Sequence, residues 1–303
     1  MGRTLNRREA VKGLTLGAGI LGMGTASYAS SGKVDNSSIK ENASAMNIEL
    51  KGNINHSVCR WCYNDIPLEK LAEESKAMGL KSIEILGPAD WPVVQKYGLT
   101  CAIATDSFAS IADGFNDPAN HGHLQKSYKK LISQAADAGL PQVICFSGNR
   151  KGMDDQVGLE NCAVGLEPLV KHAEKNNITL IMELLNSKVN HKDYMCDKTP
   201  WGVELVEKIG SPNFKLLYDI YHMQIMEGDI IASIRKYHKY ISHYHTGGVP
   251  GRNEINDSQE LNYPAIMKAI LETGYKGYVA QEFIPTWDDQ LAALKEGVMI
   301  CDV

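Results

Sequence analysis

A single (β/α)8 barrel, the TIM barrel, is the fold that the sequence predicts for residues 48–303. Short apolar runs alternate with amphipathic stretches at a spacing of roughly 25–40 residues, the pattern of repeated βα units around a parallel sheet. Eight such runs occur, and several end in a residue able to bind a metal ion. At 303 residues and 44% hydrophobic content, the chain can build one large core. A doubly wound open sheet is the alternative, but no Gly-x-Gly-x-x-Gly follows the first strand, so dinucleotide binding lacks support.

Each expected strand is a short apolar run bounded by polar or turn residues. In chain order the strands occupy residues 54–58, 82–86, 100–105 and 142–146, and the runs that end at Glu183, Asp219, His245 and Glu282. Amphipathic patterns predict helices over residues 67–79, 124–138, 162–175, 202–209, 230–237, 264–273 and 287–296. Pro67 suits the first turn of the first helix, and Gly79 and Gly139 suit helix ends.

Residues 1–29 have the pattern of an export signal. Arg7 and Arg8 precede an apolar stretch, residues 13–24, and small residues follow up to Ala29, which resembles a twin-arginine signal peptide. A spanning helix needs roughly 20 strongly apolar residues, and this glycine-rich run is shorter, so no membrane association beyond the signal is expected. A disordered basic tail is the alternative. We therefore expect an exported, periplasmic protein in which residues 30–47 form a polar linker.

Charge and cysteine content exclude several classes of function. Removal of residues 1–29 takes away four basic residues and one acidic residue, which changes the net charge from −5 to −8. An acidic chain is poorly suited to nonspecific binding of nucleic acid or anionic membranes. The 7 cysteines are odd in number and scattered, so no disulfide framework is indicated. Cys59 and Cys62 have redox or zinc spacing, but no second pair follows.

Four consecutive strands, the fifth to the eighth, deliver candidate ligands at their C-terminal ends: Glu183, Asp219, His245 and Glu282. Side chains alternate along a strand, and each candidate therefore follows an aliphatic or small residue on the same face. Three carboxylates and one imidazole suit one divalent metal ion, Mn²⁺, Mg²⁺ or Co²⁺, with Zn²⁺ also compatible. For any single residue the alternative is an ordinary polar strand end, but four in succession favour a site.

Further candidates surround this group. His222 follows Asp219 in an expected loop, within reach of a substrate oxygen. Arg252 suits bidentate binding of a substrate carboxylate or hydroxyls, and an ion pair with Glu254 is the alternative. His243 is expected to support His245 rather than bind the metal. Three other residues are expected to line or hydrogen-bond within the pocket: Glu84, Trp61 and Trp91.

Several segments of this chain resemble hydroxypyruvate isomerase and its xylose isomerase-like relatives. The resemblance covers residues 54–285. It rests on these segments: Ser57-Val-Cys-Arg-Trp-Cys-Tyr63, Asp90-Trp-Pro92, Met182-Glu-Leu-Leu-Asn186, Tyr218-Asp-Ile-Tyr-His222, Val249-Pro-Gly-Arg-Asn-Glu254, Leu261-Asn-Tyr263 and Gln281-Glu-Phe283. It implies that the four strand-end residues bind one divalent metal ion, that Glu183 and Glu282 are the acid/base pair, and that His222 binds substrate. At the third ligand position hydroxypyruvate isomerases usually carry Gln. This chain has His245 there, and so resembles the ketose 3-epimerases at that position.

The function predicted from these observations is isomerisation of a 2-hydroxy carbonyl compound. The reaction would interconvert hydroxypyruvate and tartronate semialdehyde, or the two forms of a small sugar. A carboxylate removes a C–H proton beside a carbonyl, and the metal ion stabilises the enediolate. A periplasmic ketose 3-epimerase or 3-keto-sugar lyase or dehydratase is the alternative, because return of the proton to a different face or loss of a β-substituent uses the same chemistry. A non-catalytic sugar-binding barrel and a DNA-repair endonuclease are weaker alternatives. The expected partners are a small keto acid or sugar and no nucleic acid; a homo-oligomer is compatible with the sequence.

Overall fold

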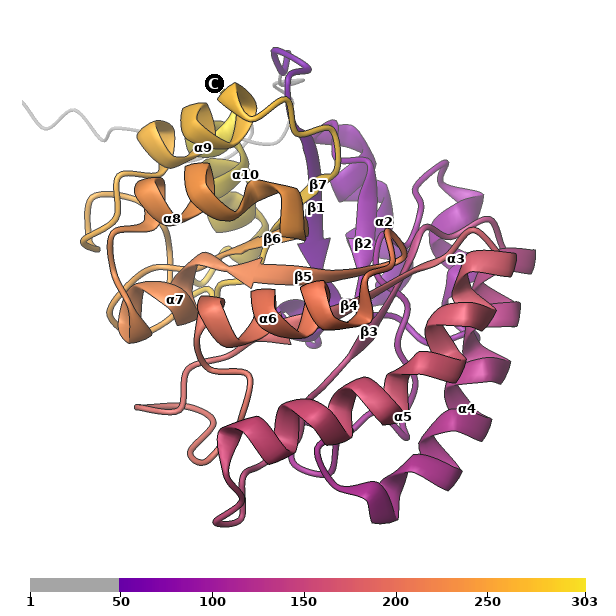
Figure 1. Ribbon diagram of the computed structural model, residues 1–303. Helices are drawn as coiled ribbons and strands as arrows, with labels where there is room; N and C mark the ends of the chain where they lie inside the picture. The colour runs from indigo at the N-terminus through magenta and orange to yellow at the C-terminus, as the bar shows by residue number, and fades with distance from the viewer. Residues whose placement is uncertain (1–48) are drawn as a thin grey trace, which may run out of the picture. The chain divides into compact units, whose positions relative to one another are not determined.

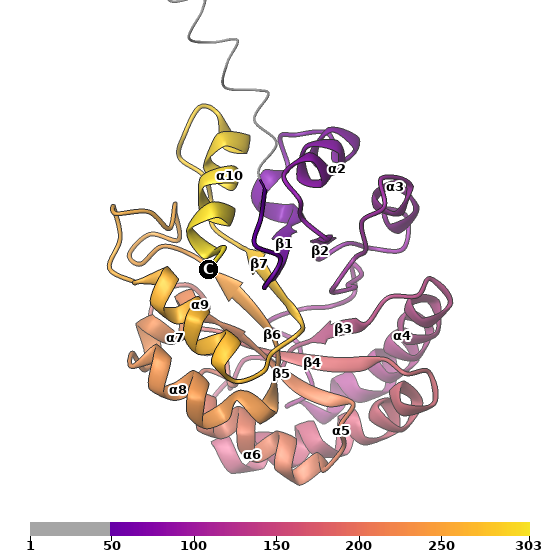
Figure 2. The ribbon, with the colours of Figure 1, turned by 90° about the horizontal axis from the view of Figure 1, so that it is seen from above.

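The computed structural model describes residues 49–303, in which a core of parallel strands is surrounded by helices (Figures 1 and 2). The predicted signal peptide, residues 1–29, and the predicted linker, residues 30–47, lie outside the described residues. Strands and helices alternate along the chain, and each strand runs in the same direction as its neighbours. This is the predicted TIM barrel.

Within the described residues, seven strands form one sheet in the order β2-β1-β7-β6-β5-β4-β3. The strands are β1 (Asn55–Cys59), β2 (Ser82–Glu84), β3 (Gln142–Cys145), β4 (Thr179–Leu184), β5 (Phe214–Asp219), β6 (Ile241–Thr246) and β7 (Tyr278–Gln281). All residues of β4 after Thr179 are buried. Both of its faces are covered, as expected for a strand between a packed barrel interior and outer helices.

The predicted third strand, residues 100–105, is not a regular strand in the structure. Its pairings are isolated parallel bridges, Ser82–Thr100, Leu86–Ala104 and Ala104–Val143. Between them the Ala102 N–H donates to the hydroxyl of Ser82 at 2.8 Å, which interrupts the backbone ladder. The segment still bridges to β2 on one side and β3 on the other, and so it closes the barrel.

The described helices cover the outside of the sheet (Figure 2). They are α2 (Leu68–Ala77), α3 (Trp91–Lys96), α4 (Pro118–Asp137), α5 (Asp155–Lys175), α6 (Thr199–Ile209), α7 (Ile220–Met226), α8 (Ile230–Tyr237), α9 (Tyr263–Glu272) and α10 (Gln290–Cys301), with short 3-10 turns at Arg60–Tyr63 and His238–Tyr240. Helices α4 and α5 begin earlier than predicted. The side chains of Asp117 and Asp154 accept hydrogen bonds from the first backbone N–H groups of these helices. The sequence pattern did not predict α3 or α7.

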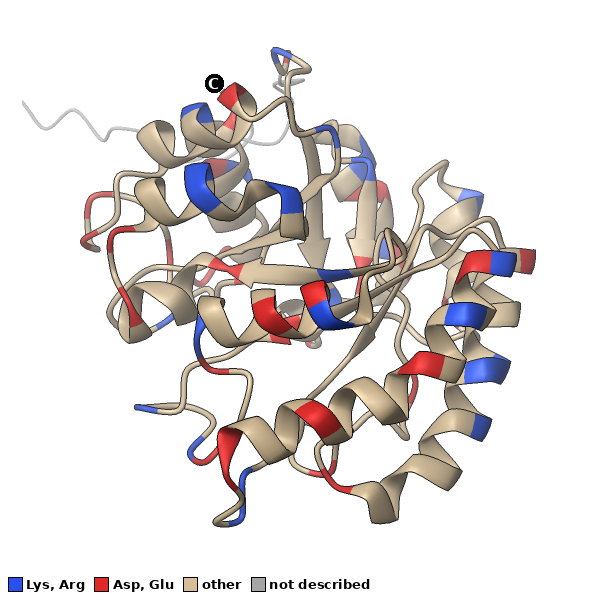
Figure 3. Ribbon diagram, in the orientation of Figure 1, with Lys and Arg blue, Asp and Glu red and all other residues tan. Residues whose placement is uncertain are grey.

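Apolar side chains fill the barrel and the space between the strands and the helices. Basic and acidic residues are interspersed along the outer helices (Figure 3). Within residues 49–303, no helix combines the length and the apolar character needed to cross a membrane. All seven cysteines are buried and unpaired.

Candidate active site

The structure brings the four predicted ligands together. Glu183 lies near the end of β4, Asp219 ends β5, His245 is the penultimate residue of β6, and Glu282 follows β7. One nitrogen or oxygen atom from each lies within 4.8 Å of those of the other three, and all four residues are buried. The strand register explains this proximity, because Asp219 pairs directly with His245 across β5 and β6.

His245 lies at the centre of this group. Its Nδ1 is 2.9 Å from Oε2 of Glu282 and 3.5 Å from Oε1 of Glu183. Its other ring nitrogen, Nε2, faces away from these carboxylates and lies 2.9 Å from Oε1 of Glu84. The ring therefore lies between the carboxylate of Glu84 on β2 and the carboxylates of Glu183 and Glu282.

Asp219 uses its two carboxylate oxygens differently. Oδ1 accepts a hydrogen bond of 3.1 Å from the backbone N–H of His222, so Asp219 caps the N-terminus of α7. Oδ2 points into the site and lies 3.3 Å from Nη2 of Arg252. One side chain therefore both starts a helix and faces the other candidate ligands.

Arg252 extends from the loop after β6 into the mouth of the site. Its Nη2 donates to Oε2 of Glu282 at 2.5 Å as well as to Asp219. The guanidinium also lies over two aromatic rings, 5.0 Å from the ring centre of Trp61 and 5.3 Å from that of Tyr221. The alternative ion pair with Glu254 does not form.

Glu254 instead holds the segment that follows β7. Its carboxylate accepts hydrogen bonds from the backbone N–H groups of Thr286 and Trp287 and from the Thr286 hydroxyl. The guanidinium of Arg252 therefore pairs with Asp219 and Glu282 rather than with Glu254.

The predicted loop position of His222 is wrong. The residue lies in the first turn of α7 and is fully buried. The cap made by Asp219 is the physical reason, because it starts the helix directly after the strand. Nδ1 of His222 accepts hydrogen bonds from the backbone N–H and the side-chain amide of Asn186, at 3.1 Å and 2.6 Å. Nε2 lies 3.6 Å from Oδ2 of Asp219 and accepts or donates no hydrogen bond among the described residues. That nitrogen is thus a buried donor available to a ligand.

Glu84 and His243 lie next to His245 rather than at the mouth. Oε1 of Glu84 is 2.9 Å from the Nε2 atoms of both histidines. Its Oε2 accepts a hydrogen bond of 2.5 Å from the hydroxyl of Ser57. Burial acts to raise the pKa of Glu84, but His243 and His245 outweigh it and lower that pKa to about 2. Glu84 is therefore an ionised carboxylate within the barrel.

The two tryptophans occupy different places. Trp61 donates its indole N–H to Oε1 of Glu282 at 2.7 Å, and its ring lies against Arg252, so it forms part of the site. Trp91 begins α3, where its indole N–H donates to the backbone carbonyl of Leu86 at 3.0 Å and its ring joins the hydrophobic core.

The carboxyl groups of the candidate ligands differ in their electrostatics. Burial raises the pKa of Glu183, and it raises the pKa of Asp219 well above its ordinary value. Burial acts in the same direction on Glu282, but Arg252 and His245 hold the pKa of Glu282 well below its ordinary value. A single guanidinium thus compensates one carboxylate of the crowded set more fully than the others.

This donor set fits a divalent metal ion. With all three carboxylates ionised, Arg252 compensates one negative charge, and a divalent cation would balance the remainder. Oε1 of Glu183 is buried and accepts no hydrogen bond from residues 49–303. Carboxylate oxygens and an imidazole nitrogen suit Mn²⁺, Mg²⁺, Co²⁺ or Zn²⁺. Glu183, Asp219, His245 and Glu282 would hold the ion.

Three residues without a predicted role contact residues of the site. Asn186 fixes the ring of His222, Ser57 hydrogen-bonds Glu84, and Tyr221 contacts Arg252. Asn186 and Tyr221 lie two or three residues beyond a candidate ligand, at the C-terminal end of a strand, and that position is a usable signal in a TIM barrel. Ser57 lies within a strand and offers no such signal.

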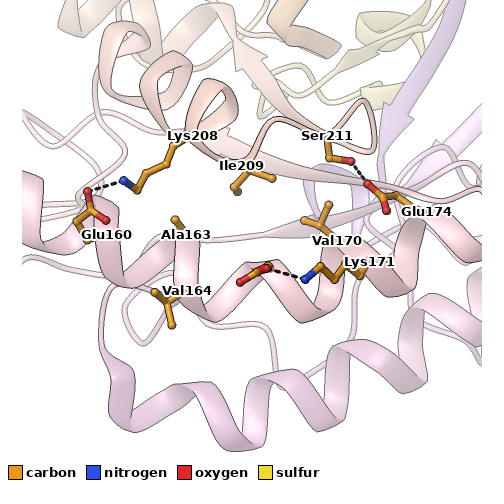
Figure 4. A pocket seen from close by; sticks show the side chains of 10 residues that line it. Glu160, Ala163, Val164, Val170, Lys171, Glu174, Lys208, Ile209 and Ser211 are labelled. Atoms are coloured by element: carbon orange, nitrogen blue, oxygen red, sulfur yellow. Dashed lines mark hydrogen bonds and ion pairs between the residues drawn. The ribbon is translucent and has the colours of Figure 1, made fainter.

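A separate hollow lies on the outer surface between α5 and α6 (Figure 4). Its charged groups already pair with lining residues: Lys208 with Glu160, Lys171 with Glu167, and the Ser211 hydroxyl with Glu174. Because these groups satisfy one another, the hollow does not compete with the strand ends as the candidate active site.

The chain is similar to several known isomerases and shares its fold with a sugar epimerase. A putative hydroxypyruvate isomerase of Homo sapiens is 26% identical over 234 residues, covering 75% of this chain and 78% of that protein. The hydroxypyruvate isomerase of Escherichia coli strain K12 is 30% identical over 242 residues, covering 70% of this chain and 86% of that protein. A crystal structure of D-psicose 3-epimerase with D-tagatose from Clostridium cellulolyticum H10 has the same fold, with a TM-score of 0.67, 19% identity, and coverage of 82% of this chain and 100% of that chain.

A family model described as the xylose isomerase-like TIM barrel matches residues 73–299. The match spans far more than half of the chain and includes the four candidate ligands. The family resemblance suggested by the short segments is therefore confirmed: this protein belongs to the xylose isomerase-like TIM barrel family.

Proposed function

We propose that this protein is a divalent-metal-dependent isomerase of the hydroxypyruvate isomerase type. Its substrate is a 2-hydroxy carbonyl compound. The enzyme interconverts either hydroxypyruvate and tartronate semialdehyde or the isomers of a small sugar. The observation that carries the proposal is the buried group of three carboxylates and one imidazole at the C-terminal ends of β4–β7. This is the end of the barrel at which TIM-barrel enzymes place their active sites. The isomerase relatives from two organisms support the same reaction class.

Each residue of the site has a distinct role in the proposed reaction. Glu183 and Glu282 move the proton between neighbouring carbons, one as base and the other as acid. His222 donates Nε2–H to a substrate oxygen, because that nitrogen is buried and has no partner among the described residues. Arg252 holds the carboxylate or hydroxyl groups of the substrate, since its guanidinium lies at the mouth against Trp61. The metal ion, when bound, supplies positive charge where the oxygens of the substrate become negative.

A ketose 3-epimerase is the second candidate function. His245 supports it, because an imidazole occupies the ligand position where hydroxypyruvate isomerases usually have an amide. In that reaction the two glutamates act on opposite faces of one carbon, and the product is an epimer rather than a shifted carbonyl.

Proton exchange in D₂O distinguishes these reactions. Purified protein with one equivalent of Mn²⁺ is incubated separately with hydroxypyruvate, with ketoses and with 3-keto glycosides, and product is followed by NMR. The proposal expects deuterium to enter the product of hydroxypyruvate as tartronate semialdehyde forms. Epimer formation from a ketose alone would favour the second candidate, and elimination from a 3-keto glycoside would indicate a lyase. Absence of exchange in all three, with the metal ion bound, would contradict both candidates.

Export to the periplasm through the twin-arginine pathway is a further part of the proposal. Arg7, Arg8 and the apolar stretch after them support it. Replacement of both arginines by lysine should leave the protein in the cytoplasmic fraction of the host cell, whereas the unaltered chain should reach the periplasmic fraction. Equal distribution of the two forms would contradict this assignment.

A further inference from the structure

Glu84 is a buried carboxylate that the proposed reaction does not use. It ends β2, on the far side of His245 from the other three carboxylates of the site. Oε2 accepts a 2.5 Å hydrogen bond from the hydroxyl of Ser57, and Oε1 lies 2.9 Å from Nε2 of His245. Nε2 of His243 is also 2.9 Å from Oε1. Because β1 and β6 both contribute contacts, the carboxylate is fixed in position.

This arrangement decides which ring nitrogen of His245 faces the metal-binding group. The carboxylate of Glu84 lies 2.9 Å from Nε2, within hydrogen-bond distance, and can accept the hydrogen of that nitrogen. When Nε2 keeps its hydrogen toward Glu84, Nδ1 is the nitrogen that can bind a cation in place of a proton. Nδ1 lies 2.9 Å from Glu282 and 3.5 Å from Glu183, within the group that would hold the metal ion. Without Glu84, the ring could adopt the other tautomer or turn away.

We propose that Glu84 is a positioning residue that fixes the orientation and tautomer of His245, so that Nδ1 is presented to the metal ion. The inference rests on the metal site of the proposed function. Metal-binding histidines commonly donate their second ring N–H to a carboxylate, and loss of that carboxylate typically costs about 10–100-fold in metal affinity. Glu84 thereby acts through His245 and does not touch the substrate.

A second arrangement of the same residues provides the competing outcome. Sγ of Cys59 lies 3.7 Å from Nε2 of His245 and 3.9 Å from Oε1 of Glu84, close enough for these three residues to form a metal site of their own. In that arrangement Nε2 would be a ligand and could not donate to Glu84. In the proposed arrangement one ion binds and Nε2 of His245 keeps its hydrogen. In the competing arrangement a further ion binds at Cys59, Glu84 and His245, and Nε2 carries no hydrogen.

The test is a Co²⁺ titration of the metal-free full chain, followed by absorbance and by proton NMR of the Co²⁺ form. Glu84→Gln keeps the shape of the side chain and removes its charge, and Glu84→Asp keeps the charge but shortens the reach. Ser57→Ala is the matched control, because it removes the other hydrogen bond of Glu84 and leaves its contact with His245. Circular dichroism of each metal-free variant reports whether the fold is retained.

We expect the unaltered chain to bind one Co²⁺ and to show a paramagnetically shifted, exchangeable proton from Nε2–H of His245. Glu84→Gln should lower Co²⁺ affinity roughly tenfold or more and should speed exchange of that proton with solvent. Glu84→Asp should lie between the two, and Ser57→Ala should stay within about threefold of the unaltered chain.

Three results would overturn the inference. In the first, Glu84→Gln binds Co²⁺ as tightly as the unaltered chain and its proton exchange is unchanged. In the second, the unaltered chain binds two ions and Glu84→Gln loses one, which makes Glu84 a ligand. In the third, the unaltered chain binds no Co²⁺. This result also contradicts the proposed function, and the titration of the unaltered chain alone separates it from the other two.

Discussion

At the C-terminal ends of the strands, four ligand-type side chains crowd within 4.8 Å of one another, whereas near the start of β1 a single buried histidine faces one carboxylate. His56 lies 3.6 Å from Oδ1 of Asp302, close to the end of the chain. The other oxygen of Asp302 accepts a hydrogen bond of 2.8 Å from the backbone N–H of Lys51. These contacts join the two ends of the barrel domain, so we expect their loss to affect stability, and loss of the crowded group to affect turnover.

The largest expected effect is on turnover at the crowded end. Glu183→Gln should reduce the rate on the order of 10²–10⁴-fold, because an amide cannot exchange the proton that the carboxylate moves. The fold should survive, since Gln has nearly the same shape. Rates of deuterium incorporation and circular dichroism test both parts. Full activity of this variant would contradict the proposed mechanism.

Metal binding should stabilise the protein through the same end. Addition of Mn²⁺ at about 100 times its Kd should raise Tm by roughly 5–10 °C, because an ion that binds only the folded state contributes about 2.7 kcal/mol. A chelator should reverse the change. Asp219→Asn keeps a helix-capping side chain but removes a charged ligand, and it should show a much smaller rise. An equal rise in both proteins would place the metal ion elsewhere.

The opposite end should affect stability without affecting turnover. Asp302→Asn removes the charge that faces His56 and weakens the hydrogen bond accepted from the backbone N–H of Lys51, and the expected loss is about 1 kcal/mol of the free energy of unfolding. Urea denaturation measures that loss, and steady-state kinetics at 25 °C serve as the control. A change in kcat of the folded variant would show that the two ends are coupled.

The contribution of His56 to stability should depend on pH. Burial lowers the pKa of His56 from its ordinary 6.5, despite the opposing effect of Asp302. The unfolded chain therefore binds a proton more readily, so the contribution of His56 is fully present above pH 6.5 and is lost as pH falls toward the lowered value. Buried His222 acts in the same direction. The difference in stability between the unaltered chain and His56→Gln should therefore change between pH 7 and pH 5, and a constant difference would contradict this account.

The smallest effect is expected on the outer surface. Lys208→Ala removes the ion pair with Glu160 in the hollow between α5 and α6, which joins two partly exposed side chains at 2.6 Å (Figure 4). Such pairs contribute about 0–1 kcal/mol. Urea denaturation should detect at most a small loss, and turnover should not change. A large loss of activity would contradict this expectation and would show that the hollow between α5 and α6 contributes to turnover.

The sequence predicted the barrel and the placement of four ligand-type residues at its strand ends, because both depend on local patterns that recur along the chain. Apolar runs mark the strands, and a strand that ends in Glu, Asp or His places that residue at the common end of the barrel. The failures have different causes. The Ser82 hydroxyl on β2 binds the backbone of Ala102 and interrupts the expected third strand, which is a contact between strands. The Asp219 cap, a local contact, converts an expected loop into α7.

Contacts between distant segments could not be predicted in this way. Trp61, Arg252 and Glu282 come from three separate parts of the chain, and only the folded structure shows that the indole and the guanidinium hold the same carboxylate. The contact of Glu84 with His245 spans 161 positions. No spacing rule within one sequence relates residues so far apart.

The capping role of Asp219 limits which side chain can stand at that position. Its short side chain lets Oδ1 reach the backbone N–H of His222 while Oδ2 remains in the site. Glutamate is one methylene longer and is a poor N-cap, so it would supply the oxygen facing the site at the expense of the helix start. The other two carboxylates of the group cap no helix in the described structure, and both are glutamates. The side-chain length at each strand end thus depends on whether a helix starts directly after the strand. Replacement of Asp219 by glutamate would therefore displace His222 as well as the metal ion.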